Sequence, residues 1–163
     1  MSNGIPFVEY YRPTNFKDII LSPLNKQIFE NILKTKCFPN LLFYGPPGTG
    51  KTTTIVNLIE SFQEMHQQKN SSLIIHLNAS DERGIDTIRN QIHSFVTSNT
   101  MFCTGMKFVI LDEVDYMTKN AQQSLRNLLQ IFTPNVRFCL ICNYINRVEE
   151  GLQNEFIKFR FNQ

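Results

Sequence analysis

The residues best placed to do chemistry form one short, glycine-rich stretch, Gly45-Pro46-Pro47-Gly48-Thr49-Gly50-Lys51-Thr52. It fits the pattern G-x-x-x-x-G-K-[ST] and lies between an apolar run, 41–44, and a helical pattern that begins near Lys51. The glycines allow consecutive backbone N–H groups to converge on an anion, and the following helix presents its positive end to that anion. Lys51 would reach the β- and γ-phosphates, and the Thr52 hydroxyl would be placed for Mg²⁺. The spacing therefore predicts a loop that binds a nucleoside triphosphate.

A second set of reactive side chains follows the apolar run 108–111, which ends in Asp112 and Glu113. Asp112, at the carboxyl end of a strand, is placed to hold Mg²⁺ next to Thr52, and Glu113 is placed to polarise an attacking water. Acidic residues end many strands, so the pair says little by itself. Its position downstream of an intact phosphate loop makes triphosphate hydrolysis the favoured interpretation.

Asn143 directly follows the strand-like run 136–142. Its amide could donate to the γ-phosphate or to the attacking water. Asparagine is equally common in turns that follow strands. Spacing alone leaves these two interpretations open.

Hydrophobic periodicity predicts the helices and strands that must position these residues. Helical spacing covers 23–36, 51–67, 85–96 and 119–131, and short apolar runs at 41–44, 73–77, 108–111, 136–142 and 157–161 predict five strands. Strands that alternate with helices are typical of an α/β fold, in which a parallel sheet is covered on both faces. At 163 residues with 42% hydrophobic content, we expect one domain, 1–163.

Composition restricts the other interpretations. The net charge of +2 gives no electrostatic argument for DNA binding, and the absence of a long apolar run argues against a membrane span and for a soluble, intracellular protein. The four cysteines, Cys37, Cys103, Cys139 and Cys142, could suggest zinc. However, the odd spacing of Cys139 and Cys142 within one strand sends them to opposite faces, which favours buried thiols.

Several stretches together resemble the small subunits of replication factor C, the AAA+ sliding-clamp loader. The resemblance covers nearly the whole chain: 8–13, with Tyr10 where a lysine is usual, 40–54 around the phosphate loop, 77–86 (Leu-Asn-Ala-Ser-Asp-Glu-Arg-Gly-Ile-Asp), the acidic box 112–115, and 137–144 (Arg-Phe-Cys-Leu-Ile-Cys-Asn-Tyr). It implies a five-stranded P-loop sheet in the order 5-1-4-3-2. It also implies one AAA+ ATPase core that binds ATP and Mg²⁺.

The resemblance also assigns roles to individual residues. Asn143 is expected to be sensor 1, Asn78 to hold Glu113 inactive until DNA binds, and Arg83 and Arg89 to follow the DNA backbone. A solvated basic face is an equally good interpretation of the two arginines. The nucleotide-contacting set is Val8, Tyr11, Arg12 and Pro13 around the adenine, together with the loop from Gly45 through Thr53.

Two departures from the family pattern stand out. In register with the family's Ser-Arg-Cys motif, whose arginine reaches the neighbouring subunit's ATP, this chain has Asn154-Glu155-Phe156. A carboxylate in that place would repel a triphosphate. Arg147 or Arg160 could instead act as the arginine finger, the residue that reaches the neighbouring subunit's ATP. The chain also ends at Gln163, where the helical lid and collar would begin, so we expect those parts and the sensor-2 arginine to lie outside it.

The leading hypothesis is therefore an ATPase, weak by itself, that works with other clamp-loader subunits, a sliding clamp and primer-template DNA in replication, and has no membrane partner. It would be nuclear in a eukaryotic cell and cytoplasmic otherwise. One alternative is a non-catalytic or truncated assembly subunit that binds nucleotide structurally. Another is a different AAA+ machine such as a junction helicase, which the 77–86 box disfavours.

Overall fold

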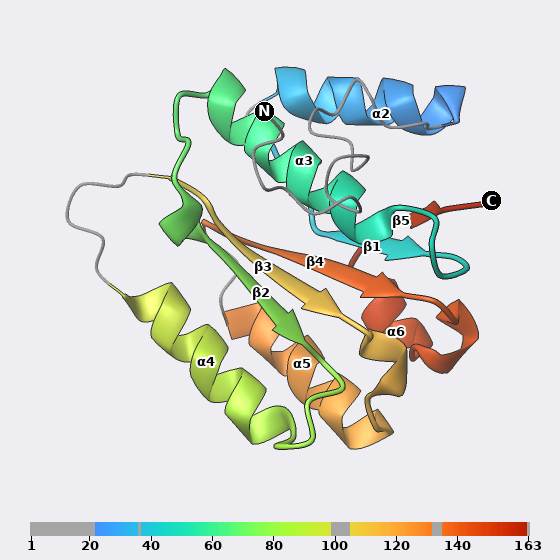
Figure 1. Cartoon of the computed structure of the whole chain (residues 1–163). Coiled ribbons are helices and arrows are strands. Elements are labelled where there is room, and N and C mark those ends of the chain that lie inside the picture. Colours follow the sequence, from blue (N-terminus) through green and yellow to red (C-terminus); the bar gives the residue numbers. More distant parts are fainter. Residues whose placement is uncertain (1–21, 36, 99–104, 132–134, 163) are drawn as a thin grey trace, which may run out of the picture.

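The computed structural model describes residues 22–35, 37–98, 105–131 and 135–162 (Figure 1). The strands are β1 (Leu41–Tyr44), β2 (Ile74–Asn78), β3 (Lys107–Asp112), β4 (Val136–Cys142) and β5 (Ile157–Arg160). The helices are α2 (Pro23–Lys34), α3 (Lys51–Met65), α4 (Ile85–Thr97), α5 (Lys119–Ile131) and α6 (Glu150–Gln153). Each predicted strand and longer helix is present, with ends that move by a few residues.

The strands form one parallel sheet in the order β2-β3-β4-β1-β5. This is the expected order read from the opposite edge, so the α/β prediction is confirmed. The short strand β1 is an interior strand: Leu41 lies opposite Cys139 of β4 on one side and Ile157 of β5 on the other. The phosphate loop therefore leaves the sheet from a position that is hydrogen-bonded on both sides.

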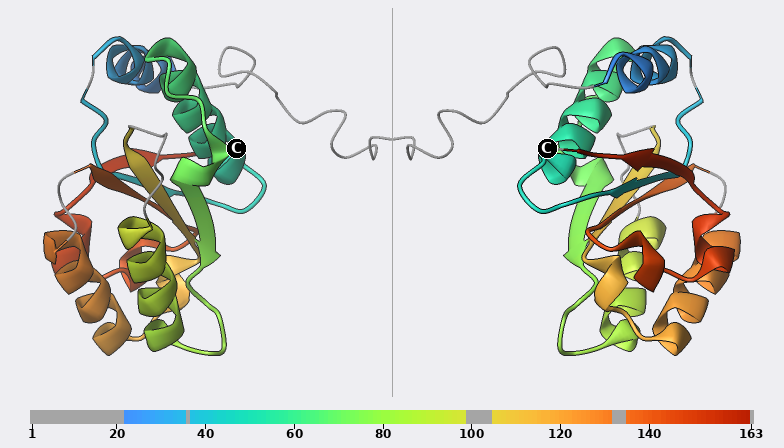
Figure 2. Two further views of the ribbon diagram at one scale, coloured as in Figure 1. Left: turned by 90° about the vertical axis from the view of Figure 1, so that its left-hand side faces the viewer. Right: turned by 90° about the vertical axis from the view of Figure 1, so that its right-hand side faces the viewer.

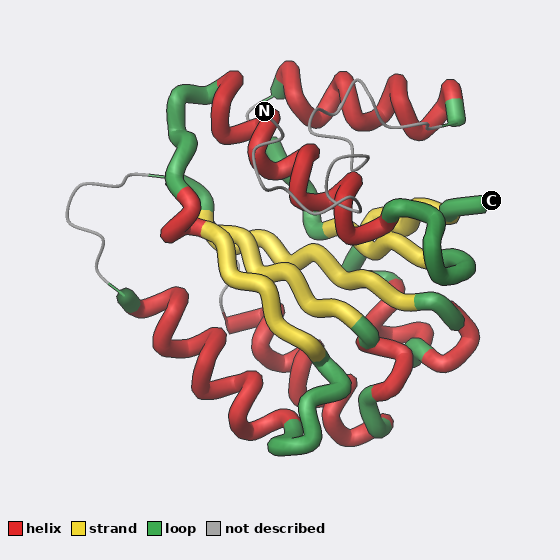
Figure 3. Tube along the Cα trace, in the orientation of Figure 1, coloured by secondary structure: helices red, strands yellow, loops and turns green. Residues whose placement is uncertain are grey.

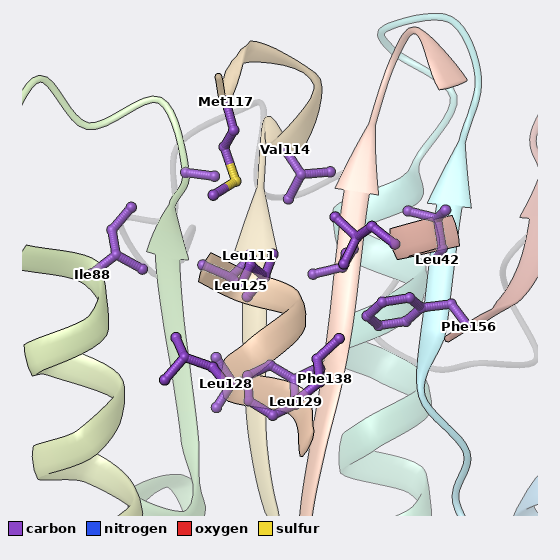
Figure 4. Packing of buried hydrophobic residues seen from close by; sticks show 14 of the residues in the cluster. Leu42, Ile88, Leu111, Val114, Met117, Leu125, Leu128, Leu129, Phe138 and Phe156 are labelled. Atoms are coloured by element: carbon purple, nitrogen blue, oxygen red, sulfur yellow. The ribbon is translucent and has the colours of Figure 1, made fainter. Parts of the chain in front are cut away.

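Helices cover both faces of the sheet, with α2 and α3 on one face and α4, α5 and α6 on the other (Figures 1 and 2). Under α2 and α3, the core is rich in phenylalanine, and Phe29 stacks on Phe43 with ring centroids 5.6 Å apart. On the opposite face, leucines of α5 pack on Leu111 and Phe138 (Figure 4). Because helices exclude water from both faces of the sheet, the central strands have unbroken apolar runs in the sequence.

The cysteines follow this two-sided pattern. Cys139 lies in the core under α2 and α3, and Cys142 lies in the core on the opposite face, as the odd spacing predicts. Burial raises the pKa of both thiols, that of Cys142 to about 12. The expectation of a buried thiol is wrong for Cys37, which is exposed, and Cys103 lies outside the described residues. Within the described ranges, no group of three or more His, Cys, Asp or Glu side chains could hold a metal ion.

Parallel pairing brings the carboxyl ends of all the strands to one edge of the sheet, where the loops after β1, β3 and β4 gather (Figure 3). In an open α/β sheet, this edge is where ligands bind. Among the described helices, none is long and apolar enough to cross a membrane.

Candidate active site

The phosphate loop is held against the sheet at its first residue. Gly45 has φ of +149°, and a Cβ atom there would lie 2.1 Å from the backbone oxygen of Phe161. At the other end, Gly50 is left-handed, with φ of 82°, and it is the residue that caps α3. A side chain would be strained at both positions, so the loop requires glycine to turn the α3 N-terminus toward a ligand.

Lys51 lies inside this loop and is 6% exposed. Its Nζ donates to the backbone oxygens of Gly45 at 2.8 Å and Pro46 at 2.7 Å, and to Thr49 Oγ1 at 3.3 Å. Burial lowers the pKa of Lys51, and the nearby carboxylates of Asp112 and Asp115 oppose that shift. The ammonium group thus donates hydrogen bonds to neutral carbonyl groups. A phosphate anion would take the place of these acceptors and form stronger, charge-assisted hydrogen bonds.

Thr52, in the first turn of α3, contacts Asp112 at the end of β3: Thr52 Oγ1 donates to Asp112 Oδ2 at 3.2 Å. The pKa of Asp112 is lowered, chiefly by the nearby His76 ring, whose Nε2 lies 3.8 Å from Oδ2, beyond hydrogen-bond distance, and further by hydrogen bonds from the Glu113 N–H and the Thr52 hydroxyl. One carboxylate beside one hydroxyl suits Mg²⁺, because this ion commonly takes its other ligands from substrate phosphates and water. The donor set therefore fits the expected metal.

These residues surround one open cavity of about 370 Å³. Its lining consists of the loop and the strand ends: Pro47, Gly48, Thr49, Gly50, Lys51, Thr52, Thr53, Asp112, Ile141 and Asn143. Residues up to 96 positions apart in the sequence, Pro47 and Asn143, thus line one hollow. Val8, Tyr11, Arg12 and Pro13, expected around the adenine, lie outside the described residues.

Asp115 is a residue whose role the sequence did not indicate. It is 5% exposed, and its Oδ2 accepts the backbone N–H of Asn143 at 3.2 Å and of Tyr144 at 3.0 Å. The last residue of the acidic box therefore fixes the turn that carries Asn143. The available sequence signal was a carboxylate between the apolar residues Val114 and Tyr116, since a charged residue is rarely buried without partners.

We expect Asp115→Ala to destabilise the chain by about 2–5 kcal/mol, because two partly buried N–H groups lose their acceptor at about 1–3 kcal/mol each. Asp115→Asn keeps an acceptor oxygen and should lose less than half of that. The free energy of unfolding in urea measures both. Asp86→Ala, at a carboxylate that is 84% exposed, is the matched control and should change the stability by less than about 0.5 kcal/mol. A loss for Asp115→Ala as small as the control's would contradict the anchoring role.

Glu113 follows directly after β3 in a left-handed conformation, with φ of 59° and ψ of 38°. Its Oε2 accepts a hydrogen bond from the Ser80 hydroxyl, and Ser80 is in turn bonded to Asn78 Oδ1. In the described part of the chain, Asn78 and Glu113 share no hydrogen bond. The contact between Asn78 and Glu113 that the expected hold would need is therefore absent from the described residues, and the two side chains are linked only through Ser80.

The two arginines expected to contact DNA are already paired. Arg83 forms a forked contact with Asp81, with Nη2 to Oδ2 at 2.7 Å, and this contact lowers the pKa of Asp81 to about 2. Arg89 lies 3.4 Å from Asp86 on the same helix. Both guanidinium groups are exposed, so a phosphate could reach them, but it would have to compete with a carboxylate.

Glu155, the residue in register with the family's arginine finger, pairs within the chain. Its Oε1 lies 3.6 Å from Arg126 Nε of α5, and its side chain is 36% exposed. The two alternative arginines differ: Arg147 lies over the ring of Tyr144 at 4.6 Å, and Arg160 is exposed on the edge strand β5. Phe156, next to Glu155, is buried in the core under α5 and α6.

The fold and the site define a phosphate-loop nucleotide-binding protein of the AAA+ type: an interior strand leads through a glycine-rich loop into a helix beginning at Lys51, and a second strand ends in acidic residues. The sequence pattern of the family described as "ATPase family associated with various cellular activities (AAA)" matches residues 41–162. The chain belongs to this AAA family.

Curated relatives extend the match to the rest of the chain. Replication factor C subunit 5 of Homo sapiens is 47% identical over 97% of this chain and 46% of its own length. Replication factor C subunit 3 of Saccharomyces cerevisiae is 41% identical over 97% of this chain and 46% of its own length. These relatives confirm the predicted resemblance, and the chain spans about half of their length.

Solved structures support the fold. A RuvB mutant from Thermotoga maritima superposes with a TM-score of 0.67 at 16% identity, over 94% of this chain and 50% of its own. A DNA polymerase III gamma subunit-related protein from the same organism gives 0.64 at 17% identity, over 84% of this chain and 45% of its own. At such identities, the likeness concerns the fold only.

Proposed function

We propose that the chain binds Mg-ATP at the cavity formed by the phosphate loop and the ends of β3 and β4, and hydrolyses it. The observation that carries this proposal is the meeting of Lys51, Thr52, Asp112 and Asn143 around one cavity, with Thr52 bonded to Asp112 at 3.2 Å. A loop of this kind without the acidic strand end would bind phosphate but would lack the metal-binding carboxylate.

Each residue has a distinct task in the proposed reaction. Lys51 exchanges the carbonyls of Gly45 and Pro46 for phosphate oxygens, and the glycine-rich loop presents its N–H groups to them. Glu113 accepts a proton from the attacking water, and Asn143 donates its amide to the γ-phosphate or to that water. Mg²⁺, held by Thr52 and Asp112, would neutralise charge that develops on the phosphates.

We further propose that this ATPase is the core of a clamp-loader small subunit that works with other such subunits, a sliding clamp and primer-template DNA in replication. Support comes from relatives named replication factor C subunits over 97% of the chain. The whole of residues 1–163 would act as one ATPase core, nuclear if its cell is eukaryotic and cytoplasmic otherwise. The intact Lys51, Asp112, Glu113 and Asn143 argue against a purely structural nucleotide site.

The test is ATP turnover measured for the chain alone and after mixing with full-length clamp-loader subunits. We expect slow turnover alone and faster turnover in the mixture, because activating residues come from neighbours. A Glu113→Gln variant in the mixture separates this chain's own hydrolysis from that of its partners. ATP binding without turnover in either setting would favour the structural, non-catalytic alternative.

DNA binding gives a separate prediction. Replacing both Arg83 and Arg89 by alanine should weaken duplex binding for every sequence and reduce the slope of log affinity against log salt by about two units, one for each phosphate that the variant no longer neutralises. Fluorescence anisotropy at several salt concentrations measures the slope. Lys69→Ala, an exposed cation paired with Glu64 at the far end of α3, is the matched control. An unchanged slope in the double variant would exclude these arginines as phosphate-binding residues.

A further inference from the structure

His76, on the edge strand β2, lies beside the carboxylate on which the proposed metal site depends. Its ring nitrogen Nε2 is 3.8 Å from Asp112 Oδ2. The same oxygen accepts the Thr52 hydroxyl at 3.2 Å. A hydroxyl from α3 and an imidazole from β2 therefore face one carboxylate oxygen.

The sheet places His76 on the side of the phosphate loop. β2 and β3 pair in parallel, and Asn78, two positions beyond His76, lies opposite Asp112 (Figure 1). Side chains alternate along a strand, and Ile74, two positions before His76, packs against the core under α2 and α3. His76 therefore projects to the face that α3 covers, and α3 begins at the phosphate loop.

Packing does not explain a histidine at this position. The His76 side chain is 44% exposed, and the described residues offer its ring no hydrogen-bond partner, since 3.8 Å to Asp112 is beyond hydrogen-bond range. It is, however, a separation that two ligands of one cation can keep. Metal–ligand bonds of about 2.1 Å put neighbouring ligand atoms about 3–4 Å apart.

The chemistry of imidazole decides which cation such a set of ligands favours. Mg²⁺ prefers oxygen ligands in a near-octahedral arrangement and gives up its water reluctantly. First-row transition cations accept imidazole nitrogen, and among them Mn²⁺ also suits carboxylate and water oxygens. A carboxylate, a hydroxyl and an imidazole together therefore suit Mn²⁺ better than they suit Mg²⁺.

We propose that His76 is a third protein ligand at the metal site, beside Thr52 and Asp112, and that it binds a first-row transition cation such as Mn²⁺ but not Mg²⁺. This inference rests on the proposed ATP site, and it names the metal preference of that site. With Mg²⁺, the imidazole stays outside the coordination shell. With Mn²⁺, Nε2 takes the place of one water.

The chain offers a matched control. His93 of α4 is also exposed, and α4 covers the face of the sheet opposite α3 (Figure 1). His76→Phe removes the ligand nitrogen and keeps a planar ring, and His93→Phe makes the same change away from the site. His76→Gln removes the imidazole but keeps a polar side chain, so it separates loss of the ligand from any effect of an added apolar ring.

Two quantities are measured in the full 163-residue chain with a non-hydrolysable ATP analogue. Calorimetry gives the Kd of the analogue in saturating Mn²⁺ and in saturating Mg²⁺. Electron spin echo spectroscopy of the bound Mn²⁺ complex gives the coupling between the metal and nearby nitrogen nuclei. Histidine labelled with ¹⁵N distinguishes the imidazoles of the protein from the ¹⁴N of the nucleotide.

For the wild type and His93→Phe, we expect the ¹⁵N coupling of a directly bound imidazole. In His76→Phe and His76→Gln, this coupling should disappear. The Kd of the Mn²⁺ complex should rise about tenfold in these two variants, whereas that of the Mg²⁺ complex should change by less than about twofold. A purely structural role of His76 would weaken both complexes alike.

The outcomes separate failure of this inference from failure of the proposed function. If the wild type binds the Mn²⁺ complex without a ¹⁵N coupling, the ligand role is wrong and the ATP site stands. Equal losses of affinity with the two metals in both His76 variants would also overturn the ligand role. If the wild type binds the analogue with neither metal, the proposed Mg-ATP site is refuted, and the metal preference with it.

Discussion

Lys51→Ala should weaken ATP binding by about a hundredfold or more, whereas Glu113→Gln should bind ATP as well as the wild type and lose about a hundredfold or more in turnover. The cause differs in the two cases. Lys51 is the fixed cation of the phosphate loop, so its loss removes charge-assisted bonds to the β- and γ-phosphates in every state. Glu113 acts on the water, so its amide isostere leaves the ground state intact.

Calorimetric titration with ATP and Mg²⁺ gives the affinities, and phosphate release gives turnover. Lys51→Ala also leaves the carbonyls of Gly45 and Pro46 without their ammonium partner, so thermal unfolding of the variant must show that the chain still folds. Lys69→Ala, which removes an exposed cation that is paired with Glu64, should bind and hydrolyse ATP normally. Equal loss of binding in the Lys51 and Glu113 variants would contradict the assignment of roles.

The second large effect concerns the neighbour's site. In a mixed complex in which this chain carries Glu113→Gln, we expect Glu155→Arg to raise turnover at the adjacent subunit by up to about 10³–10⁵, the value of an arginine finger when chemistry limits the rate. Arg126, which pairs with Glu155 at 3.6 Å, would repel the new guanidinium and so direct it outward. Turnover of the complex, measured with and without this single substitution, tests the expectation.

The structure also decides how the finger should be restored. Changing the whole Asn154-Glu155-Phe156 segment to the family's Ser-Arg-Cys would empty a core position, because Phe156 is 8% exposed, and a large-to-small change there costs about 3–5 kcal/mol. The single change at Glu155 avoids this loss. Glu150→Arg, at an exposed position on the short helix α6 just before Glu155, controls for added charge. If Glu155→Arg has no effect and turnover is already fast, the register is wrong or Arg147 or Arg160 serves as the finger.

Most of the fold was readable from the sequence because its signals are local. The strands β3 and β4 are buried on both faces, and an unbroken apolar run such as 108–111 marks such a strand without any knowledge of its neighbours. The phosphate loop is likewise contiguous. The carboxyl ends of parallel strands share one edge, so the convergence of Lys51, Asp112 and Asn143 follows from the strand order.

The side-chain partners were not predictable in the same way. Ser80 reaches Glu113 across 33 positions, and that contact depends on the left-handed backbone at Glu113, which no residue pattern announces. Arg126 and Glu155 meet because α5 packs against α6, a short helix just before Glu155 that the periodicity did not predict. His76 has the sequence context of an ordinary surface or packing residue, yet it contributes most to lowering the pKa of Asp112. Such partners depend on tertiary geometry and on rotamers.

The most direct test of the ATPase proposal is a crystal structure of the chain with Mg²⁺ and a non-hydrolysable ATP analogue. We predict the triphosphate inside the loop 45–52, with Lys51 Nζ moved from the Gly45 and Pro46 carbonyls to the β- and γ-phosphates, and the metal held by Thr52 and Asp112. A nucleotide bound elsewhere, or a triphosphate in the loop with Lys51 still on those carbonyls and no metal at Asp112, would contradict the account.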